Sequence, residues 1–317
     1  MLKQLSLTLA SLTLGAGLGL AAELFEMRNE AEFKKIIAPD AKLTRLATGM
    51  WFTEGPVWVP RDGGYLIFSD LSGNQLKKWT AAEGLKTFRE ISNFSNGNCL
   101  DLQGRLITAE HTSHRLSRSE ADGTVETLVD QYEGKRLNSP CDVVVKSDGS
   151  IWFTDPDYGV SRADKQQPGN FVFRLDPAKQ HLSVVIKDIP KPNGLCFSPD
   201  EKRLYVADAG LAHNIRVLTV QPDGTAADGK VFCTIGIGMA FGIRCDADGR
   251  LWSSAGPGIE IYAPDGSLIG KIFTRETPAN LCFGGPDGKT LYITARKSLY
   301  SMPVLVTGAK PAPAAAP

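Results

Sequence analysis

The sequence predicts an all-β protein, a six-bladed β-propeller, because one phrase recurs along almost the whole chain. Each copy is an apolar strand, a tight turn with Asp or Gly, and a short aromatic or β-branched run. Successive copies start 42, 45, 52, 48 and 38 residues apart. Repeats of about 40 to 50 residues, with four strands each, are typical of propeller blades. The 32 Gly and 19 Pro residues also argue against long helices. The copies begin at Glu54, Asn96, Cys141, Asn193, Phe241 and Ala279.

Each copy supplies two strands, and the intervals between copies supply the other two. The text EGPVWVPRDGGYLIFSD from Glu54 is a strand, a turn and a second strand. Among these intervals, the segments FVFRLDP at Phe171 and IEIYAPDG at Ile259 are also typical of strands. Two β-sandwiches would not explain one repeated phrase, so we expect a single propeller domain over residues 23–305. Within it, residues 23–50 should serve as a lead-in and take part in closing the ring.

The two ends of the chain have a different composition from the repeats. Residues 1–22 combine Lys3, an uncharged apolar run and small residues near Ala22, which predicts a cleaved signal peptide. The alternative is an uncleaved membrane anchor. We therefore expect an exported protein, periplasmic or secreted, without stable membrane insertion after cleavage. Residues 306–317 contain PAPAAAP and are expected to be a disordered tail.

Charge and cysteine content narrow the choice of partner. The chain has 35 basic and 35 acidic residues, so it lacks the excess positive charge of a phosphate-binding surface. We expect a small-molecule substrate and no nucleic acid. None of the six Cys residues forms a CxxC pair, and most lie in apolar segments that are predicted to be strands. Buried, reduced thiols are therefore expected for most of them.

The repeat aligns two sets of residues from distant parts of the chain. The first residues of the copies should converge on the central channel, where a carboxylate with amide oxygens suits a hard cation such as calcium. The second strands end in acids in four copies, and these acids are expected to support the site or line the substrate. The alternative is that Asp at a strand end bonds nearby backbone N–H groups, which we expect for at least two of the four. These strand ends are Asp70, Glu110, Asp155, Asp208, Ala255 and Ala295.

Four segments together resemble the gluconolactonase family, which includes regucalcin. They are EGPVW at Glu54, RLNSPCDVVVKSDGSIWFTDPDYG from Arg136, KPNGLCFSPDEKRLYVAD from Lys191 and PANLCFGGPDGKTLYIT from Pro278. The resemblance covers roughly residues 50–302. It implies a six-bladed propeller with one divalent metal in the channel, where the metal polarises a lactone or ester and activates water.

Carrying the family's site over, residue by residue, gives two retained and two altered positions. The resemblance implies Glu54 and Asn193 as metal ligands. The family's Asn of an Asn-Asp pair falls on Cys141, and its metal-binding, proton-transferring Asp falls on Phe241. A Phe ring cannot ligate a metal or move a proton.

Three outcomes are compatible with these replacements. A calcium ion is retained more weakly by Glu54, Asn193 and water, with Asp208 or Asp155 assisting as the catalytic base. Alternatively, Cys141 favours a softer ion such as zinc. In the third outcome the metal is lost, and Cys141 is either a quiet buried residue or a nucleophile with His111 as its base.

The remaining candidate residues are expected to contact substrate. His111 follows a strand end and suits hydrogen bonding or proton transfer, or is a loop His held by its neighbours. Arg136 suits a carboxylate or hydroxyls, or forms a loop salt bridge. We predict a gluconolactonase-like hydrolase of a sugar lactone or related cyclic ester, by metal-assisted attack of water. The alternative is a propeller that binds a sugar or other small ligand without catalysis. The predicted substrate-binding residues are Asn96, Glu110, His111, Arg136, Cys141 and Asp142.

Overall fold

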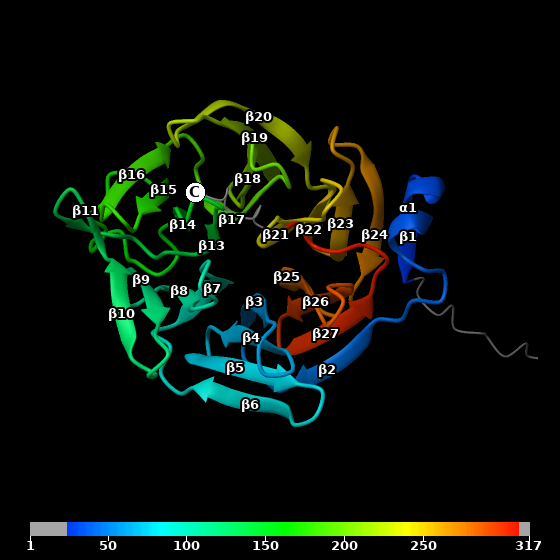
Figure 1. The fold of residues 1–317 in the computed structure, drawn as a ribbon. Helices are drawn as coiled ribbons and strands as arrows, with labels where there is room; N and C mark the ends of the chain where they lie inside the picture. Colours follow the sequence, from blue (N-terminus) through cyan, green and yellow to red (C-terminus); the bar gives the residue numbers. More distant parts are fainter. Residues whose placement is uncertain (1–23, 311–317) are drawn as a thin grey trace, which may run out of the picture.

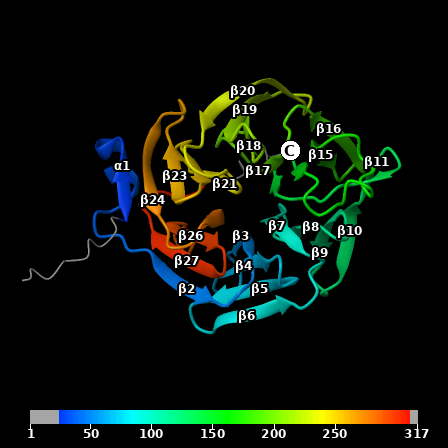
Figure 2. The same ribbon diagram turned by 180° about the vertical axis from the view of Figure 1, so that it is seen from behind.

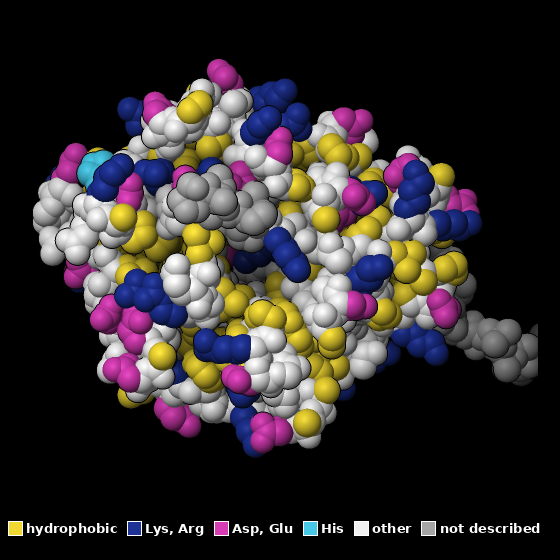
Figure 3. Space-filling model, in the orientation of Figure 1, with side chains coloured by type: hydrophobic (Ala, Val, Ile, Leu, Met, Phe, Trp, Pro, Cys, Tyr) yellow, Lys and Arg dark blue, Asp and Glu magenta, His cyan; other side chains and the backbone are white. Residues whose placement is uncertain are grey.

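Six antiparallel sheets form a ring around a central channel in the computed structural model, which describes residues 24–310 (Figure 1). The same ring is seen from behind in Figure 2. This confirms the predicted six-bladed propeller. The face shown in Figure 3 is hollowed at its centre, with Lys or Arg side chains beside the hollow.

Each blade follows the repeat, with the first strand of a copy nearest the axis. Blade 1 contains β3 (Thr53–Val59), β4 (Tyr65–Asp70), β5 (Gln75–Thr80) and β6 (Gly84–Arg89). Blade 2 contains β7 (Ser95–Leu100), β8 (Leu106–Glu110), β9 (Arg115–Ser119) and β10 (Val125–Val129). Blade 3 contains β13 (Val143–Val145), β14 (Ile151–Asp155), β15 (Phe171–Asp176) and β16 (His181–Ile186). A small hairpin of β11 (Gln131–Tyr132) and β12 (Lys135–Arg136) lies between blades 2 and 3 in the chain.

The second half of the ring follows the same order and is completed by the N-terminal strands. Blade 4 contains β17 (Pro192–Phe197), β18 (Arg203–Asp208), β19 (Asn214–Val220) and β20 (Ala226–Thr234). Blade 5 contains β21 (Ile243–Cys245), β22 (Leu251–Ser254), β23 (Gly258–Tyr262) and β24 (Leu268–Phe273), with β1 (Phe25–Met27) added outside β24. Blade 6 contains β25 (Pro278–Gly284), β26 (Thr290–Ala295) and β27 (Ser298–Pro303), with β2 (Thr44–Thr48) as its fourth strand.

Strand β2 closes the ring, as expected for residues 23–50. It pairs antiparallel with β27, so the N-terminal and C-terminal parts of the propeller share one sheet. Between β1 and β2, helix α1 (Glu30–Ile36) is capped by Asn29, which accepts a hydrogen bond from the Glu32 amide. Its buried residues Phe33 and Ile36 pack on the core of blades 5 and 6.

Aromatic contacts between neighbouring blades recur at equivalent positions. Trp152 of β14 meets Phe197 of the next blade edge-on, with ring centroids 5.4 Å apart. Trp252 of β22 meets Phe283 in the same way at 5.3 Å. Such edge-to-face pairs add to the apolar area that the blades bury between them. These aromatic residues of the repeated segments therefore lie at the interfaces between blades.

The C-terminal segment is more ordered than predicted. Residues 306–309 were expected to belong to a disordered tail, but the Thr307 carbonyl accepts from Ala247 and the Ala309 amide donates to the Cys245 carbonyl. This part of the prediction is wrong, because the edge of β21 offers free backbone groups that 306–309 pair with. The predicted signal peptide and residues 311–317 lie outside the described residues, so export stays a prediction. Within residues 24–310, no helix has the length and apolar character needed to span a membrane.

Candidate functional site

In four of the six copies, a glycine one residue after the start of the copy lets the inner strands come together at the channel. The amides of Gly97, Gly194 and Gly242 each donate to a carbonyl of the next blade, at 2.7 to 2.8 Å. A Cβ on Gly194 would lie 2.0 Å from the Phe241 carbonyl oxygen. Glycine therefore allows the blades to approach closely at the axis. At the equivalent position, blades 3 and 6 carry Asp142 and Asn280 instead.

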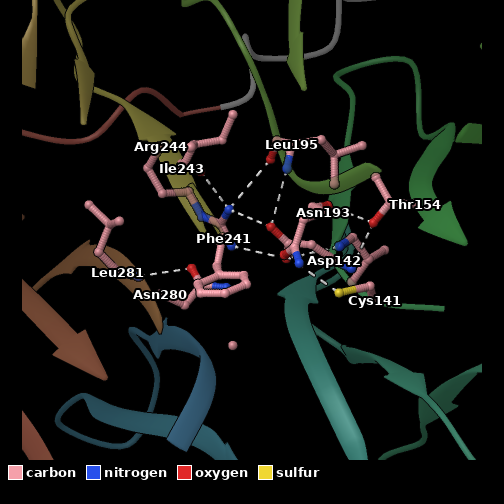
Figure 4. A network of polar contacts seen from close by, with 12 residues as sticks. Cys141, Asp142, Thr154, Asn193, Leu195, Phe241, Ile243, Arg244, Asn280 and Leu281 are labelled. Atoms are coloured by element: carbon pink, nitrogen blue, oxygen red, sulfur yellow. Dashed lines mark hydrogen bonds and ion pairs between the residues drawn. The ribbon is translucent and has the colours of Figure 1, made fainter. Parts of the chain in front are cut away.

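Side chains from three blades form a chain of contacts in the channel. Asn96 Nδ2 lies 3.3 Å from both Cys141 Sγ and His111 Nε2. Cys141 Sγ lies 3.6 Å from Asn193 Oδ1, and Asn193 Nδ2 lies 3.5 Å from the hydroxyl of Tyr158. Figure 4 shows Cys141, Asn193 and Phe241 around the same space. The predicted convergence is thus seen for four of the six first residues, namely Asn96, Cys141, Asn193 and Phe241.

Glu54 is a buried carboxyl group held by protein donors. Its Oε2 accepts from the Gly55 amide at 3.1 Å and from Asn280 Nδ2 at 3.2 Å. Burial raises the pKa of Glu54 to about 7, and these two hydrogen bonds limit the rise. The group therefore changes its charge near neutral pH, as a general base requires.

The neighbouring His and Cys side chains are both held in their neutral forms. Burial lowers the pKa of His111 to about 4, with a smaller contribution from His114. Its Nε2 is then free to accept from Asn96. Burial, followed by the charge of Glu54, raises the pKa of the Cys141 thiol well above its usual value. A nucleophilic Cys needs the opposite shift.

Asp142 and Arg244 form an ion pair inside the channel. Arg244 Nη1 lies 2.9 Å from Asp142 Oδ2 and also donates to the Ile243 carbonyl. The Asp142 carboxylate accepts from the Val143 amide as well, and only 2% of its side chain is exposed. Asp142 is therefore occupied by protein partners and not free for the substrate contact that we predicted.

Two further predicted contacts are also corrected. The Glu110 carboxylate is fully buried, and it accepts from Arg115 at 2.7 Å and Ser117 at 2.5 Å, so it supports the β8–β9 region. Arg136 lies in the β11–β12 hairpin, which Figure 1 shows at the outer edge of the ring. Its guanidinium bonds the Asp164 carbonyl at 3.4 Å. Both residues stand beside site motifs in the sequence, but Glu110 is bonded within its own blade and Arg136 lies in the outer hairpin.

The other strand-end acids bond mainly to backbone amides, as the turn-forming alternative predicts. Asp70 Oδ1 accepts from Trp51 and Phe52, both at 3.0 Å. Asp208 Oδ1 accepts from Lys191 at 3.1 Å and Gly210 at 2.9 Å.

Asp155 differs from these acids because one of its oxygens is buried without a hydrogen bond. Its Oδ2 accepts from the Asn138 amide at 2.8 Å, whereas its buried Oδ1 has no partner among residues 24–310. Burial raises the pKa of Asp155 to about 7. The roles of Asp155 and Asp208 in proton transfer stay predictions.

Sequence reasoning missed Tyr158, Arg244 and Asn280. Tyr158 borders the site, with Lys191 Nζ 5.2 Å from the centre of its ring. Asn280 was detectable, since it occupies the position that is Gly in four other copies. The Arg244 contact had no signal in the sequence, because its partner lies 102 positions away.

A family profile described as "SMP-30/Gluconolactonase/LRE-like region" matches residues 52–297. The chain belongs to this family. A gluconolactonase of Zymomonas mobilis is 33% identical over 279 residues, which cover 79% of this chain and 78% of the relative. A solved gluconolactonase structure from Xanthomonas campestris is 34% identical with a TM-score of 0.83, covering 89% of this chain and 95% of the other.

A more distant solved structure shares the fold alone. It is a calcium-binding regucalcin from Agrobacterium tumefaciens, 20% identical with a TM-score of 0.71, covering 83% of this chain and 94% of the other.

The residues in this channel do not fit a calcium ion. Calcium takes six to eight oxygen ligands, and the two retained positions offer the Glu54 carboxylate and the Asn193 amide oxygen. Cys141 presents a protonated thiol and Phe241 presents no donor at all. Within residues 24–310, no cluster of three or more His, Cys, Asp or Glu side chains is arranged to hold a metal ion.

Proposed function

We propose that this protein hydrolyses a sugar lactone or a related cyclic ester in the central channel. One observation carries the proposal: a buried carboxyl, Glu54, shares the channel with the amides of Asn96 and Asn193 in a chain 33% identical to a gluconolactonase. A carboxylate beside fixed amide donors suits acyl transfer to water. Fold alone would not choose this function, because propellers serve many.

The chemistry requires a proton acceptor and donors for the substrate oxygens. Water attacks the lactone carbonyl carbon, forming a new C–O bond, and its proton passes to the Glu54 carboxylate. The ring C–O bond then breaks, and the proton moves to the departing alkoxide oxygen. The side-chain amides of Asn96 and Asn193 are placed to hold substrate hydroxyl or carbonyl oxygens, which replace their contacts with His111, Cys141 and Tyr158. Tyr158, at the edge of this cluster, adds a hydroxyl group.

Asp155 and Asp208 remain auxiliary candidates for proton transfer. We rank them behind Glu54, because they stand at the ends of second strands, whereas Glu54 lies on the innermost strand of blade 1. Asp208 is also tied to two backbone amides. The sequence predicted metal-assisted attack of water. Because the donors in the channel do not fit calcium, the proposed mechanism uses the Glu54 carboxylate as the proton acceptor.

The second candidate function is binding without catalysis. Phe241 supports it, because an apolar ring stands where the family resemblance implies a proton-transferring Asp. Such a protein would retain the hydrogen-bonding amides and bind a sugar lactone without opening it.

A lactone titration in a pH-stat distinguishes these functions. We would measure acid release from glucono-δ-lactone and from other aldonolactones by wild type, Glu54→Gln and the matched control Glu90→Gln, an exposed acid on a neighbouring loop. Hydrolysis by wild type and Glu90→Gln, but not by Glu54→Gln, supports the proposal. Saturable lactone binding in calorimetry without hydrolysis supports the binding function, and loss of turnover in EDTA indicates metal assistance.

A further inference from the structure

We infer that the channel works without a divalent cation, because Phe241 and Cys141 occupy two donor positions and protein groups already bond the Asn193 oxygen and one Glu54 oxygen. This inference concerns the site of the proposed function, but its test measures cation binding and not hydrolysis. Three features of the channel carry it.

The first feature is the fixed direction of the Phe241 side chain. The Phe241 amide donates to Ser254 Oγ at 2.9 Å, and its carbonyl accepts from the Gly194 amide at 2.8 Å. With the backbone held on both sides, the side chain projects toward the channel. Figure 4 shows the ring beside Asn280, facing Asp142 and Asn193. An aromatic ring there fills volume and offers no oxygen.

The second feature is the arrangement around Cys141. Its amide donates to Thr154 at 2.8 Å and its carbonyl accepts from Gly97 at 2.7 Å, so its backbone is also fixed. The thiol sits between Asn96 Nδ2 and Asn193 Oδ1 and is 2% exposed. Asn96 therefore turns its N–H donors toward this space, and the Asn193 oxygen already accepts from the thiol. Both arrangements suit a neutral ligand rather than an ion.

The third feature is the charge inside the channel. Glu54 and Asp142 each contribute one negative charge when ionised, and Arg244 contributes one positive charge. Among these three groups the formal sum is one negative charge, and Arg244 already neutralises Asp142 at 2.9 Å. The next carboxyl group, Asp155, is bonded to the Asn138 amide. A divalent ion held by Glu54 would therefore leave an excess of positive charge beside these groups, which is costly in an apolar surrounding.

The test compares cation binding by wild type with cation binding by variants that add an oxygen donor at position 241 or 141. Wild type, Phe241→Asp, Cys141→Asn and the double variant would be titrated with CaCl2 and with ZnCl2 by calorimetry and thermal denaturation. Phe241→Leu and Cys141→Ala are the matched controls, since they change the same positions without adding a donor.

We expect no stoichiometric binding of calcium or zinc by wild type and by both controls. The double variant should bind one calcium ion, with Tm raised by about 5 °C at a hundredfold excess of free calcium over Kd. Stoichiometric calcium binding by wild type that Glu54→Gln abolishes would overturn the inference. So would a folded double variant, with the circular dichroism of wild type, that binds no calcium.

The result is separable from the proposed hydrolysis. A wild type that hydrolyses lactone in EDTA and binds no cation satisfies both. If wild type binds no cation and hydrolyses no lactone, only the proposed function is contradicted. If wild type hydrolyses lactone in a calcium-dependent way, only the absence of a cation is contradicted.

Discussion

Asp142 and Arg244 join blades 3 and 5 through a two-armed ion pair, with Nη1–Oδ2 at 2.9 Å and Nη2–Oδ1 at 3.3 Å. Only 2% of the Asp142 side chain and 16% of the Arg244 side chain are exposed. The pair is therefore buried, and it links two blades that are not adjacent in the ring.

Removing one partner of this pair should destabilise the protein strongly. Arg244→Met leaves a buried carboxylate without its counter-ion, which typically costs about 3–5 kcal/mol of unfolding free energy. The double variant Asp142→Leu/Arg244→Met should recover much of that loss, because it leaves no unpaired charge. Urea denaturation measures both. As a control, Lys34→Met breaks an exposed helix pair and should leave the midpoint unchanged. Equal losses for single and double variants would contradict this account.

Stability should depend on pH through Glu54. Its pKa is about 7 in the folded protein against 4.5 in the reference state, so the folded state holds the proton more tightly. The resulting stabilisation is complete below about pH 4.5 and is lost as pH rises through about 7. Between about pH 4.5 and about 7, the unfolding free energy of wild type should therefore fall relative to that of Glu54→Gln. The fall is at most about 1.4 kcal/mol for each pH unit.

Asp155 shifts in the same direction, so the comparison with Glu54→Gln is needed to isolate one group. Asp155→Asn should remove a second part of the pH dependence. A difference between wild type and Glu54→Gln that is constant from pH 4.5 to 7 would show that Glu54 titrates normally.

Packing at the axis should tolerate no side chain at Gly194. Its Cβ would lie 2.0 Å from the Phe241 carbonyl, a backbone atom that cannot move without separating blades 4 and 5. Gly194→Ala is expected to cost about 3 kcal/mol or more. Gly236→Ala is the matched control, because a Cβ there has no atom within 4 Å and the site is exposed. Similar denaturation midpoints for the two variants would refute the argument.

Cys141 should not act as a nucleophile. Its pKa is raised by burial, so very little thiolate exists near neutral pH. Cys141→Ala is expected to keep lactone hydrolysis, and native protein should react slowly with a thiol reagent at pH 8 compared with protein in urea. Loss of turnover in folded Cys141→Ala, together with rapid labelling of Cys141, would restore the nucleophile hypothesis.

Local patterns in the sequence were sufficient for the architecture. Each copy encodes its own strands and turn, so the repeat predicts six blades, and residues 23–50 were correctly assigned to ring closure. The repeat also aligns Cys141, Asn193 and Phe241, and the structure brings these three together, because equivalent positions of a ring point to one axis. Asp70 and Asp208 behave as the turn-forming alternative predicts.

Side-chain pairing needed the tertiary structure. Arg136 and Glu110 flank site motifs along the chain. However, Arg136 lies in an outer hairpin, and the Glu110 carboxylate forms an ion pair with Arg115. The 102-residue separation of Asp142 and Arg244 leaves no periodic signal. The repeat in the sequence was thus enough to predict the six-bladed ring and the residue types at its axis. Which oxygens are bonded and which charges are paired became visible in the folded protein, because burial and hydrogen bonding depend on neighbours from other blades.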